Sequence, residues 1–220
     1  VRSDLVIAGS NFIFSHICEN YEKYLNNKNR KLLVIFRGIN TEYFSQKKVS
    51  NAKLQKQIKE WQIDKSKFII LLPGRLTNWK GQAVFIEALN ILNQQTYVKP
   101  FSAIILGSDQ GRTVYYKKLL SQIEKYRLNR IIKFIPLCKE MPLAYKLADV
   151  VVSASIEPEA FGRVSVEAQS MEKPIVASEI GGSKETILKN KSGLLFKSGD
   201  PISLAEKLKE ILNFDDSTLK

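Results

Sequence analysis

Short apolar runs alternate with amphipathic stretches from residue 68 onward, and this pattern constrains the fold more than any other feature of the chain. The strand-like runs fall at residues 68–72, 103–106, 131–134, 149–153, 174–177 and 194–196. The helical stretches fall at residues 82–93, 113–126, 142–147, 163–171, 183–188 and 202–212. A strand that returns parallel to the one before it needs a crossover, which is usually a right-handed helical connection. The alternation therefore predicts an α/β fold with a Rossmann-like, doubly wound parallel sheet.

The first part of the chain predicts a smaller unit and a linker. We expect a strand at residues 5–8, a helix at 11–25 with Ser10 as its N-cap, and a strand at 33–36. Glycine and asparagine mark residues 37–44 as a loop, and the Lys- and Gln-rich residues 45–58 predict a connection followed by a helix. We place a domain boundary near residues 38–44, which divides the chain into residues 1–42 and 43–220.

Length and composition are ordinary for a soluble globular protein, with 220 residues of which 44% are hydrophobic. No apolar run approaches the ~20 residues that cross a bilayer. The start, V-R-S-D-L-V-I-A-G, lacks the basic segment, long apolar region and cleavage site of a secretion signal. We therefore expect a cytoplasmic protein, and because the chain begins with Val and enters a strand at once, we expect it to be a fragment.

The net charge of +12 is the unusual number in the composition. It fits peripheral binding at the inner, anionic face of a membrane, but it also fits a general abundance of lysine, since the lysines are scattered along the chain. No basic ribbon interleaved with aromatic residues is present, so we do not expect nucleic-acid binding. Cys18 and Cys138 lie far apart without a neighbouring Cys or His cluster, so we expect two reduced thiols, no metal and no cofactor.

The loop P-G-R-L-T-N-W-K-G-Q follows the first strand of the regular pattern. Gly74 and Gly81 permit tight turns, and Arg75 and Lys80 place two positive charges at the carboxyl end of a strand. In a doubly wound sheet this is where ligands bind, and fixed cations there suit a phosphate. The alternative is that both cations lie on an ordinary solvated loop.

The stretch S-I-E-P-E-A-F-G-R-V-S-V-E joins the strand at 149–153 to a helix. Glu159 and Glu167 could accept hydrogen bonds from sugar hydroxyls, whereas the backbone N–H groups of residues 162–165 would suit a phosphate. Alternatively, Glu159 supplies helix-start charge and Glu167 is a surface residue. The small, apolar residues beside Glu167 argue against a surface position, because an unpaired carboxylate among them would cost free energy. Glu157 is interpreted as loop charge.

Together these loops resemble the retaining glycosyltransferases of the GT-B fold, in particular glycosyltransferase family 4, also called the group 1 family. Glu159 and Glu167 match its E-x7-E pair, and residues 74–81 match its G-R-(x)4-K-G phosphate loop. The segment R-G-I-N-T-E-Y-F resembles the link between the two GT-B domains, and I-G-G-S-K-E-T-I resembles the G-G-x-x-E-x-I segment. The resemblance covers roughly residues 35–213, which correspond to the carboxyl-terminal, donor-binding domain.

The resemblance implies a role for each matched residue. Arg75 and Lys80 would hold the diphosphate of a nucleotide-diphosphate-sugar donor, Glu167 would bind its ribose, and Glu159 with the backbone after it would hold the donor sugar. Transfer would retain the anomeric configuration without a metal. The implied catalytic residues are Arg75, Lys80 and Glu159, and the implied donor-binding residues are Gly74, Pro136, Leu137, Cys138, Lys139, Ala160, Phe161, Gly162, Val164, Ser165 and Glu167, with residues 136–139 lining the base.

The resemblance also implies a missing amino-terminal domain that would supply the acceptor site. We expect a glycan or lipid-linked acceptor of the lipopolysaccharide type and little transfer by this chain alone. His16 lies in the first predicted helix and is expected to be a structural residue. An epimerase-like enzyme, a GT-B phosphorylase, a non-catalytic nucleotide- or glycan-binding module and a basic membrane-associated scaffold are the alternatives.

Overall fold

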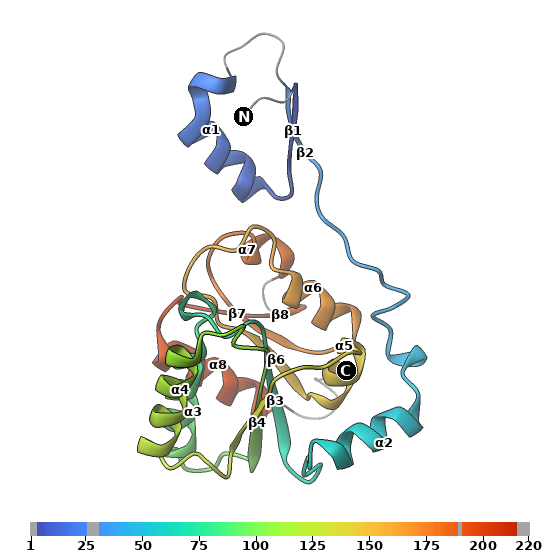
Figure 1. The fold of residues 1–220 in the computed structure, drawn as a ribbon, viewed down its shortest axis with the longest axis vertical. Helices are drawn as coiled ribbons and strands as arrows, with labels where there is room; N and C mark the ends of the chain where they lie inside the picture. The colour runs from blue at the N-terminus through green and yellow to red at the C-terminus, as the bar shows by residue number, and fades with distance from the viewer. Residues whose placement is uncertain (1–3, 26–30, 189–190, 215–220) are drawn as a thin grey trace.

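The computed structural model describes residues 4–25, 31–188 and 191–214, and its main feature is a parallel sheet of six strands (Figure 1). Every strand pair in this sheet is parallel, and the strand order is β5-β4-β3-β6-β7-β8. Numbered from the first strand of this sheet, the order is 3-2-1-4-5-6, and the doubly wound parallel sheet agrees with the prediction. The strands are β3 (Phe68–Pro73), β4 (Phe101–Leu106), β5 (Ile132–Ile135), β6 (Val150–Ser153), β7 (Ile175–Ser178) and β8 (Gly193–Phe196).

Helices cover both faces of this sheet. The helices on one face are α3 (Gln82–Asn93), α4 (Thr113–Lys125) and α8 (Pro201–Leu212). The helices on the other face are α2 (Asn51–Glu60), α5 (Met141–Leu147) and α6 (Arg163–Ser170), with the short α7 (Ser183–Thr186) following β7. Successive residues of β3 point to opposite faces, so Ile70 and Leu72 pack under the first set of helices and Ile69 and Leu71 under the second.

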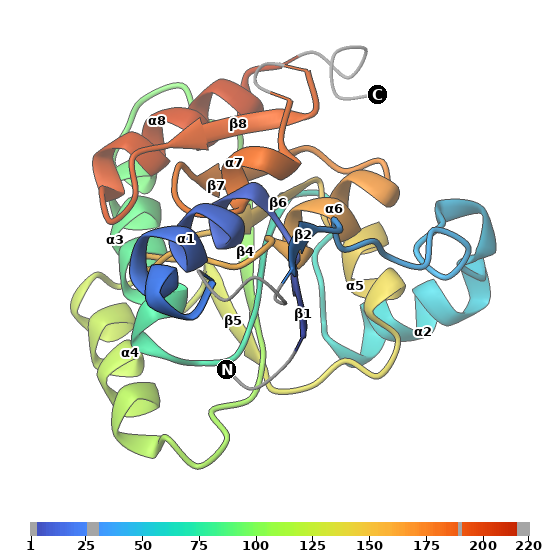
Figure 2. The same cartoon turned by 90° about the horizontal axis from the view of Figure 1, so that it is seen from above.

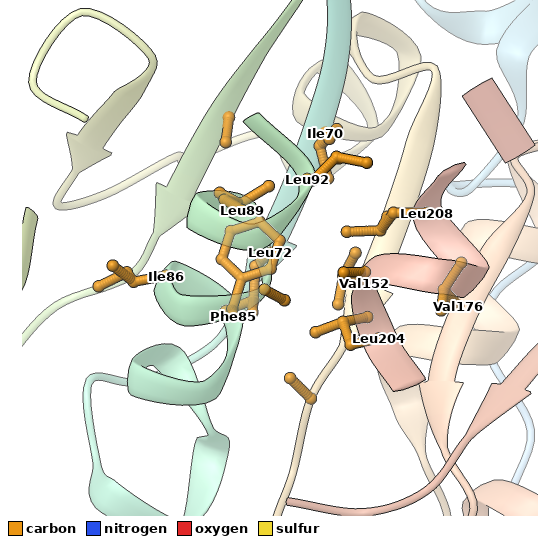
Figure 3. Close-up of a cluster of buried hydrophobic side chains, with 14 of the residues drawn as sticks. Ile70, Leu72, Phe85, Ile86, Leu89, Leu92, Val152, Val176, Leu204 and Leu208 are labelled. Atoms are coloured by element: carbon orange, nitrogen blue, oxygen red, sulfur yellow. The ribbon is translucent and has the colours of Figure 1, made fainter. Parts of the chain in front are cut away.

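Burial on both faces explains why the strands are continuous apolar runs in the sequence. The core between the sheet and helices α3 and α8 is drawn in Figure 3, where Phe85 and Leu89 of α3 face Leu204 and Leu208 of α8 across strand residues such as Val152. All of these side chains are buried. Burying one such side chain stabilises a fold by roughly 1.5–3 kcal/mol, so this layer holds the loops at the strand ends in place.

A smaller unit precedes the large sheet. It contains β1 (Leu5–Ala8), α1 (Asn11–Leu25) and β2 (Lys31–Val34), with β1 and β2 parallel. Ser10 caps α1 as predicted, since its hydroxyl accepts from the N–H of Ile13 at 3.2 Å. The unit lies above the six-stranded domain, and an extended chain connects the two (Figures 1 and 2). The division of the chain at residue 42 remains a prediction.

Several predicted boundaries were wrong by a few residues. The strand expected at 33–36 is formed by residues 31–34, because β1 ends at Ala8 and its register pairs Ala8 with Val34. The helix expected at 183–188 ends at Thr186, since Ile187 has extended backbone angles. Between Ser45 and α2 the chain forms a short 3-10 helix, η1 (Gln46–Lys48). Among the described residues, no helix is both long enough and apolar enough to cross a membrane.

Candidate donor site

The loops after β3 and β6 meet at the point where the strand order reverses. These two strands are neighbours in the sheet although β4 and β5 lie between them in the chain, and this is the position where doubly wound sheets bind ligands. The loops are joined by a hydrogen bond from the N–H of Ile156 to the carbonyl of Trp79, at 2.8 Å. The predicted phosphate loop and the predicted sugar loop are therefore in contact.

Gly81 makes this contact possible. It ends the 3-10 helix η2 (Asn78–Lys80) with a φ of +71°, and a Cβ atom at this position would lie 1.8 Å from the carbonyl oxygen of Ala154. A side chain there would force the two loops apart, so the position needs glycine for both its backbone angle and the space.

Lys80 and Glu159 form an ion pair across the two loops. Lys80 Nζ lies 2.7 Å from Glu159 Oε1, and the two side chains are only 15% and 11% exposed. The Ser155 hydroxyl donates a second hydrogen bond to the same oxygen. The ammonium also lies 4.4 Å from the centre of the Trp79 ring, which is within cation–π range. A largely buried carboxylate thus has two donors, and a largely buried cation has a carboxylate and an aromatic face.

Arg75 is placed differently from Lys80. Its backbone carbonyl accepts from the buried Gln82 amide at 2.9 Å, which fixes the loop. Its side chain is exposed, with the guanidinium carbon 5.9 Å from the centre of the Trp79 ring. Of the two cations predicted to bind phosphate, Lys80 is therefore largely buried within the site, whereas the Arg75 side chain is exposed.

Glu167 is buried, with 7% of its surface exposed, so the surface interpretation of this residue is wrong. Its Oε2 accepts from the Tyr145 hydroxyl at 2.7 Å, and its Oε1 accepts from Arg163 Nη2 at 2.8 Å. Burial, and then the nearby carboxylate of Glu167, raise the pKa of Tyr145 well above its ordinary value. The phenol therefore stays protonated and donates its hydrogen to the Glu167 carboxylate.

The Gly-rich turn before α7 holds the loop that carries Glu159. The N–H of Gly182 donates to the Glu159 carbonyl at 2.7 Å, and Gly181 has a φ of +58° where the two backbones pass close together. The small unit reaches the same loop, since the Ser10 hydroxyl donates to the Ala160 carbonyl at 2.5 Å. Three segments that are distant in the sequence thus fix the position of Glu159.

Glu185 ties the small unit to the turn before α7. Its carboxylate accepts from the N–H of Phe12 at 2.6 Å and from the N–H and side-chain amide of Asn11 at 2.8 and 3.0 Å. These N–H groups belong to the first turn of α1, where helices lack internal acceptors and favour negative charge. The start of α1 therefore lies against the six-stranded domain at the candidate site.

The structure brings most of the predicted donor-site residues together and separates one segment. Gly162 is the left-handed N-cap of α6, with Phe161 and Ser165 buried beside it. Residues 136–139 follow β5, so β4 separates them from β3 and its loop. The remaining predicted donor-site residues lie in these same segments: Gly74 in the loop after β3, Ala160 before α6, Val164 in its first turn, and Pro136, Leu137, Cys138 and Lys139 after β5.

The structure also places His16. His16 is exposed on α1, with its ring 6.4 Å from Phe12 and its Nδ1 3.2 Å from the Asn20 amide, which agrees with a structural residue. Across the part of the chain that the structure describes, no group of three or more His, Cys, Asp or Glu side chains is arranged to hold a metal ion.

Sequence reasoning missed several residues of the site. Tyr145 contacts Glu167 from another helix, and no short-range pattern connects them. Trp79 was part of the phosphate-loop motif, but its role as an aromatic platform for Lys80 depends on side-chain direction. Ser155 lies four residues before Glu159, so a short polar pair could have been proposed, although not its role.

Comparison with known proteins agrees with this geometry. The family model for glycosyl transferases group 1 matches residues 53–218. The chain is 28% identical to the D-inositol 3-phosphate glycosyltransferase of Corynebacterium urealyticum, over 99% of this chain and 50% of that protein. It thus spans about half the length of this curated relative.

Two solved structures extend the comparison to the fold. The glycosyltransferase from Rickettsia africae has a TM-score of 0.86 and 33% identity, covering 94% of this chain and 52% of that one. Anabaena HepE, solved in complex with UDP-glucose, has a TM-score of 0.84 and 27% identity, covering 99% of this chain and 56% of that one. The family resemblance read from the motifs is confirmed. The chain belongs to the glycosyl transferases group 1 family, and its six-stranded domain has the fold of a GT-B glycosyltransferase domain.

Proposed function

We propose that this chain is the donor-binding part of a retaining glycosyltransferase, which moves a sugar from a nucleotide-diphosphate-sugar to a glycan or lipid-linked acceptor. The observation that carries the proposal is the Lys80–Glu159 ion pair, which joins the phosphate loop after β3 to the sugar loop after β6 at 2.7 Å. A cation and a hydroxyl-binding carboxylate at the switch point are what a sugar diphosphate requires on its two sides. Binding of UDP-glucose by Anabaena HepE supports a donor of this class.

In this proposal the protein stabilises the diphosphate as it leaves. Lys80, Arg75 and the N–H groups at the start of α6 face the negative charge that grows on the leaving phosphate. The bond between the anomeric carbon and the phosphate oxygen breaks, and the acceptor oxygen bonds to the same face of that carbon. Because the new bond forms on the face that the phosphate leaves, the anomeric configuration is retained. The acceptor proton passes to the leaving phosphate, so the charges balance. Arg75 and Lys80 supply the positive charge that this step needs, and we propose that no metal takes part.

Glu167 and Glu159 have separate roles in the proposed site. Glu167 is held inside the domain by Tyr145 and is suited to the ribose of the nucleotide. Glu159 lies at the Lys80 side and, with the backbone of residues 160–162, is suited to hydroxyls of the donor sugar. Residues 136–139 follow the edge strand β5 and are proposed to line the base.

Calorimetric titration tests the proposal. Uridine, guanosine and adenosine diphosphates are titrated into the parent chain and into Arg75→Ala and Glu167→Ala. We expect the parent to bind at least one of them and each variant to bind it at least about tenfold more weakly, because each loses a hydrogen bond to a charged group. Glu157→Ala is the matched control, since Glu157 is an exposed carboxylate of the same loop and is expected to leave binding unchanged. Equal affinity in all four proteins, or no binding by the parent, contradicts the proposal.

A second candidate function follows from the charge of +12, which favours a basic scaffold that binds an anionic membrane surface. A glycosyltransferase could also bind the membrane if its acceptor is a lipid. On that basis we propose that the whole protein is cytoplasmic and lies peripherally on the membrane. Pelleting with vesicles of anionic lipid in the presence and absence of nucleoside diphosphate separates the two candidate functions. A chain that binds vesicles but no nucleotide is a scaffold.

A further inference from the structure

The two carboxylate oxygens of Glu167 have partners from different elements. Oε1 accepts from Arg163, which lies one turn earlier on the same helix. Oε2 accepts from the hydroxyl of Tyr145, which comes from α5. The carboxylate therefore lies between its own helix and a neighbouring one, and each oxygen can be considered separately.

The two partners also differ in exposure. The Tyr145 side chain is fully buried and packs against the Phe44 ring, with centroids 5.9 Å apart. The Arg163 side chain is 67% exposed. Exposed ion pairs within a helix contribute little and exchange readily with solvent, whereas a hydrogen bond inside a packed core keeps its geometry. Oε2 of Glu167 is therefore held by a buried partner, and Oε1 by an exposed partner that can exchange.

We infer that Tyr145 is a positioning residue that holds the Glu167 carboxylate so that Oε1 accepts from the ribose hydroxyls of a bound nucleotide. The inference rests on the proposed function, in which Glu167 binds the ribose. Tyr145 does not contact the nucleotide itself in this arrangement, because its hydroxyl is directed to Oε2 inside the core. Ribose recognition thus depends on the Tyr145 hydroxyl, which contacts Glu167 and not the nucleotide.

The chemistry predicts a specific consequence of removing this hydroxyl. A carboxylate anchored at one oxygen has little freedom to rotate, so the other oxygen meets a ribose hydroxyl without losing conformational entropy. Without the Tyr145 hydroxyl, Oε2 loses its buried donor and the carboxylate is drawn toward Arg163 and solvent. The loss falls on contacts to the ribose hydroxyls and leaves contacts to the diphosphate in place.

The test is discrimination between ribonucleotides and deoxynucleotides. The nucleoside diphosphate that the parent chain binds most tightly is titrated alongside its 2′-deoxy and 3′-deoxy counterparts. The proteins are the parent, Tyr145→Phe, Glu167→Ala and Arg163→Ala. We expect the parent to prefer the ribonucleotide over at least one deoxy form by roughly tenfold, the worth of one hydrogen bond to a charged group. Tyr145→Phe should lose most of this preference, as Glu167→Ala does, while binding the deoxy forms like the parent.

Two controls separate positioning from general damage. Tyr116→Phe removes the hydroxyl of a tyrosine that packs on Phe134 at the opposite face of the sheet, and it should keep the parental preference. Arg163→Ala should keep it within about twofold, because the exposed guanidinium is the exchangeable partner. Should Tyr145→Phe fail to fold, Arg163→Ala decides: loss of the preference in that variant assigns the anchoring to Arg163 and overturns the inference.

The outcomes distinguish this inference from the function on which it rests. If Glu167→Ala loses the ribose preference and Tyr145→Phe keeps it, the proposed site stands and the role of Tyr145 is wrong. If the parent shows no preference, or Glu167→Ala retains it, the ribose role of Glu167 fails and the inference fails with it.

Discussion

The two cations of the phosphate loop differ in what surrounds them, and this difference predicts different mutant phenotypes. Lys80 is paired with the largely buried Glu159, whereas the Arg75 side chain is exposed. Lys80→Ala leaves Glu159 without its cation, so we expect a loss of about 1–3 kcal/mol in unfolding free energy together with weaker nucleotide binding. Arg75→Ala should weaken binding but change stability by less than about 0.5 kcal/mol. Urea unfolding and calorimetry on both variants check this, and equal stability in the two variants contradicts a structural role for the ion pair.

Cys138 provides a residue-scale test of the base-binding segment. Burial raises the pKa of its thiol, and the Sγ lies 3.2 Å from the Glu140 carbonyl. A raised thiol pKa means less thiolate at a given pH, so alkylation of Cys138 in a Cys18→Ser background should be slow at pH 7. Its rate should still rise with pH above the point at which the alkylation rate of an ordinary thiol becomes constant. If residues 136–139 line the base, saturating nucleoside diphosphate should slow this alkylation several-fold. In Cys138→Ser, alkylation of Cys18 serves as the control, and a nucleotide-independent rate at Cys138 argues against the base-lining role.

The site was predictable from the sequence where its residues follow the carboxyl ends of strands. Arg75, Lys80 and Glu159 each follow a strand by a few residues, so parallel topology brings them to the same edge. Tyr145 could not be found in this way, because its contact with Glu167 depends on how α5 packs against α6. The buried state of Glu167 was suggested by its apolar neighbours, since a carboxylate there needs partners.

At the scale of elements, the approach of the two loops depends on Gly81. Gly81 and Gly111 both have left-handed backbone angles, but only Gly81 lies against another segment, the Ala154 carbonyl. Gly111→Ala should therefore cost only the strain of the angle, about 1 kcal/mol. Gly81→Ala adds a collision with backbone, and we expect on the order of 3 kcal/mol beyond that strain. Thermal unfolding of the two variants measures the difference, and equal losses contradict the close approach.

The start of α1 gives a second element-scale prediction. Its first N–H groups, at Asn11 and Phe12, donate to the Glu185 carboxylate instead of to water. Amides at the first turn of a helix normally exchange quickly, because they have no acceptor inside the helix. In Glu185→Ala, hydrogen exchange at these two amides should accelerate by at least about tenfold relative to the parent. Lys184→Ala removes the neighbouring exposed charge and should leave the exchange rate of these two amides unchanged. If the two amides exchange without protection in the parent, they do not donate to Glu185.

Element type was easier to predict than element ends. Strands buried on both faces are continuous apolar runs, so β3, β4 and β6 were expected within one or two residues. The position of β2 was missed because its ends depend on pairing with β1, and residues 33–36 are more apolar than the observed strand, which begins at Lys31. The end of α7 was missed because Leu188 continues the apolar pattern although Ile187 already has extended backbone angles.

For the whole molecule, the alternating pattern predicted the fold class but not the order of the strands. Doubly wound sheets occur in more than one strand order, and the structure shows that the first and fourth strands of the large sheet, β3 and β6, are neighbours. The position of the small unit could not be predicted, because it depends on a few contacts between distant segments, such as Ser10 with Ala160. These contacts put α1 over the end of the six-stranded domain that carries the candidate site (Figure 2).

The central claim is that a sugar-nucleotide diphosphate binds where the loops after β3 and β6 meet. A crystal structure of this chain with a bound nucleoside diphosphate tests it most directly. We expect the phosphates to lie between Lys80, Arg75 and the start of α6, with the Lys80–Glu159 pair beside the terminal phosphate. The ribose hydroxyls should lie within hydrogen-bonding distance of Glu167 Oε1. A nucleotide bound elsewhere on the chain, or one whose ribose lies away from Glu167, contradicts it.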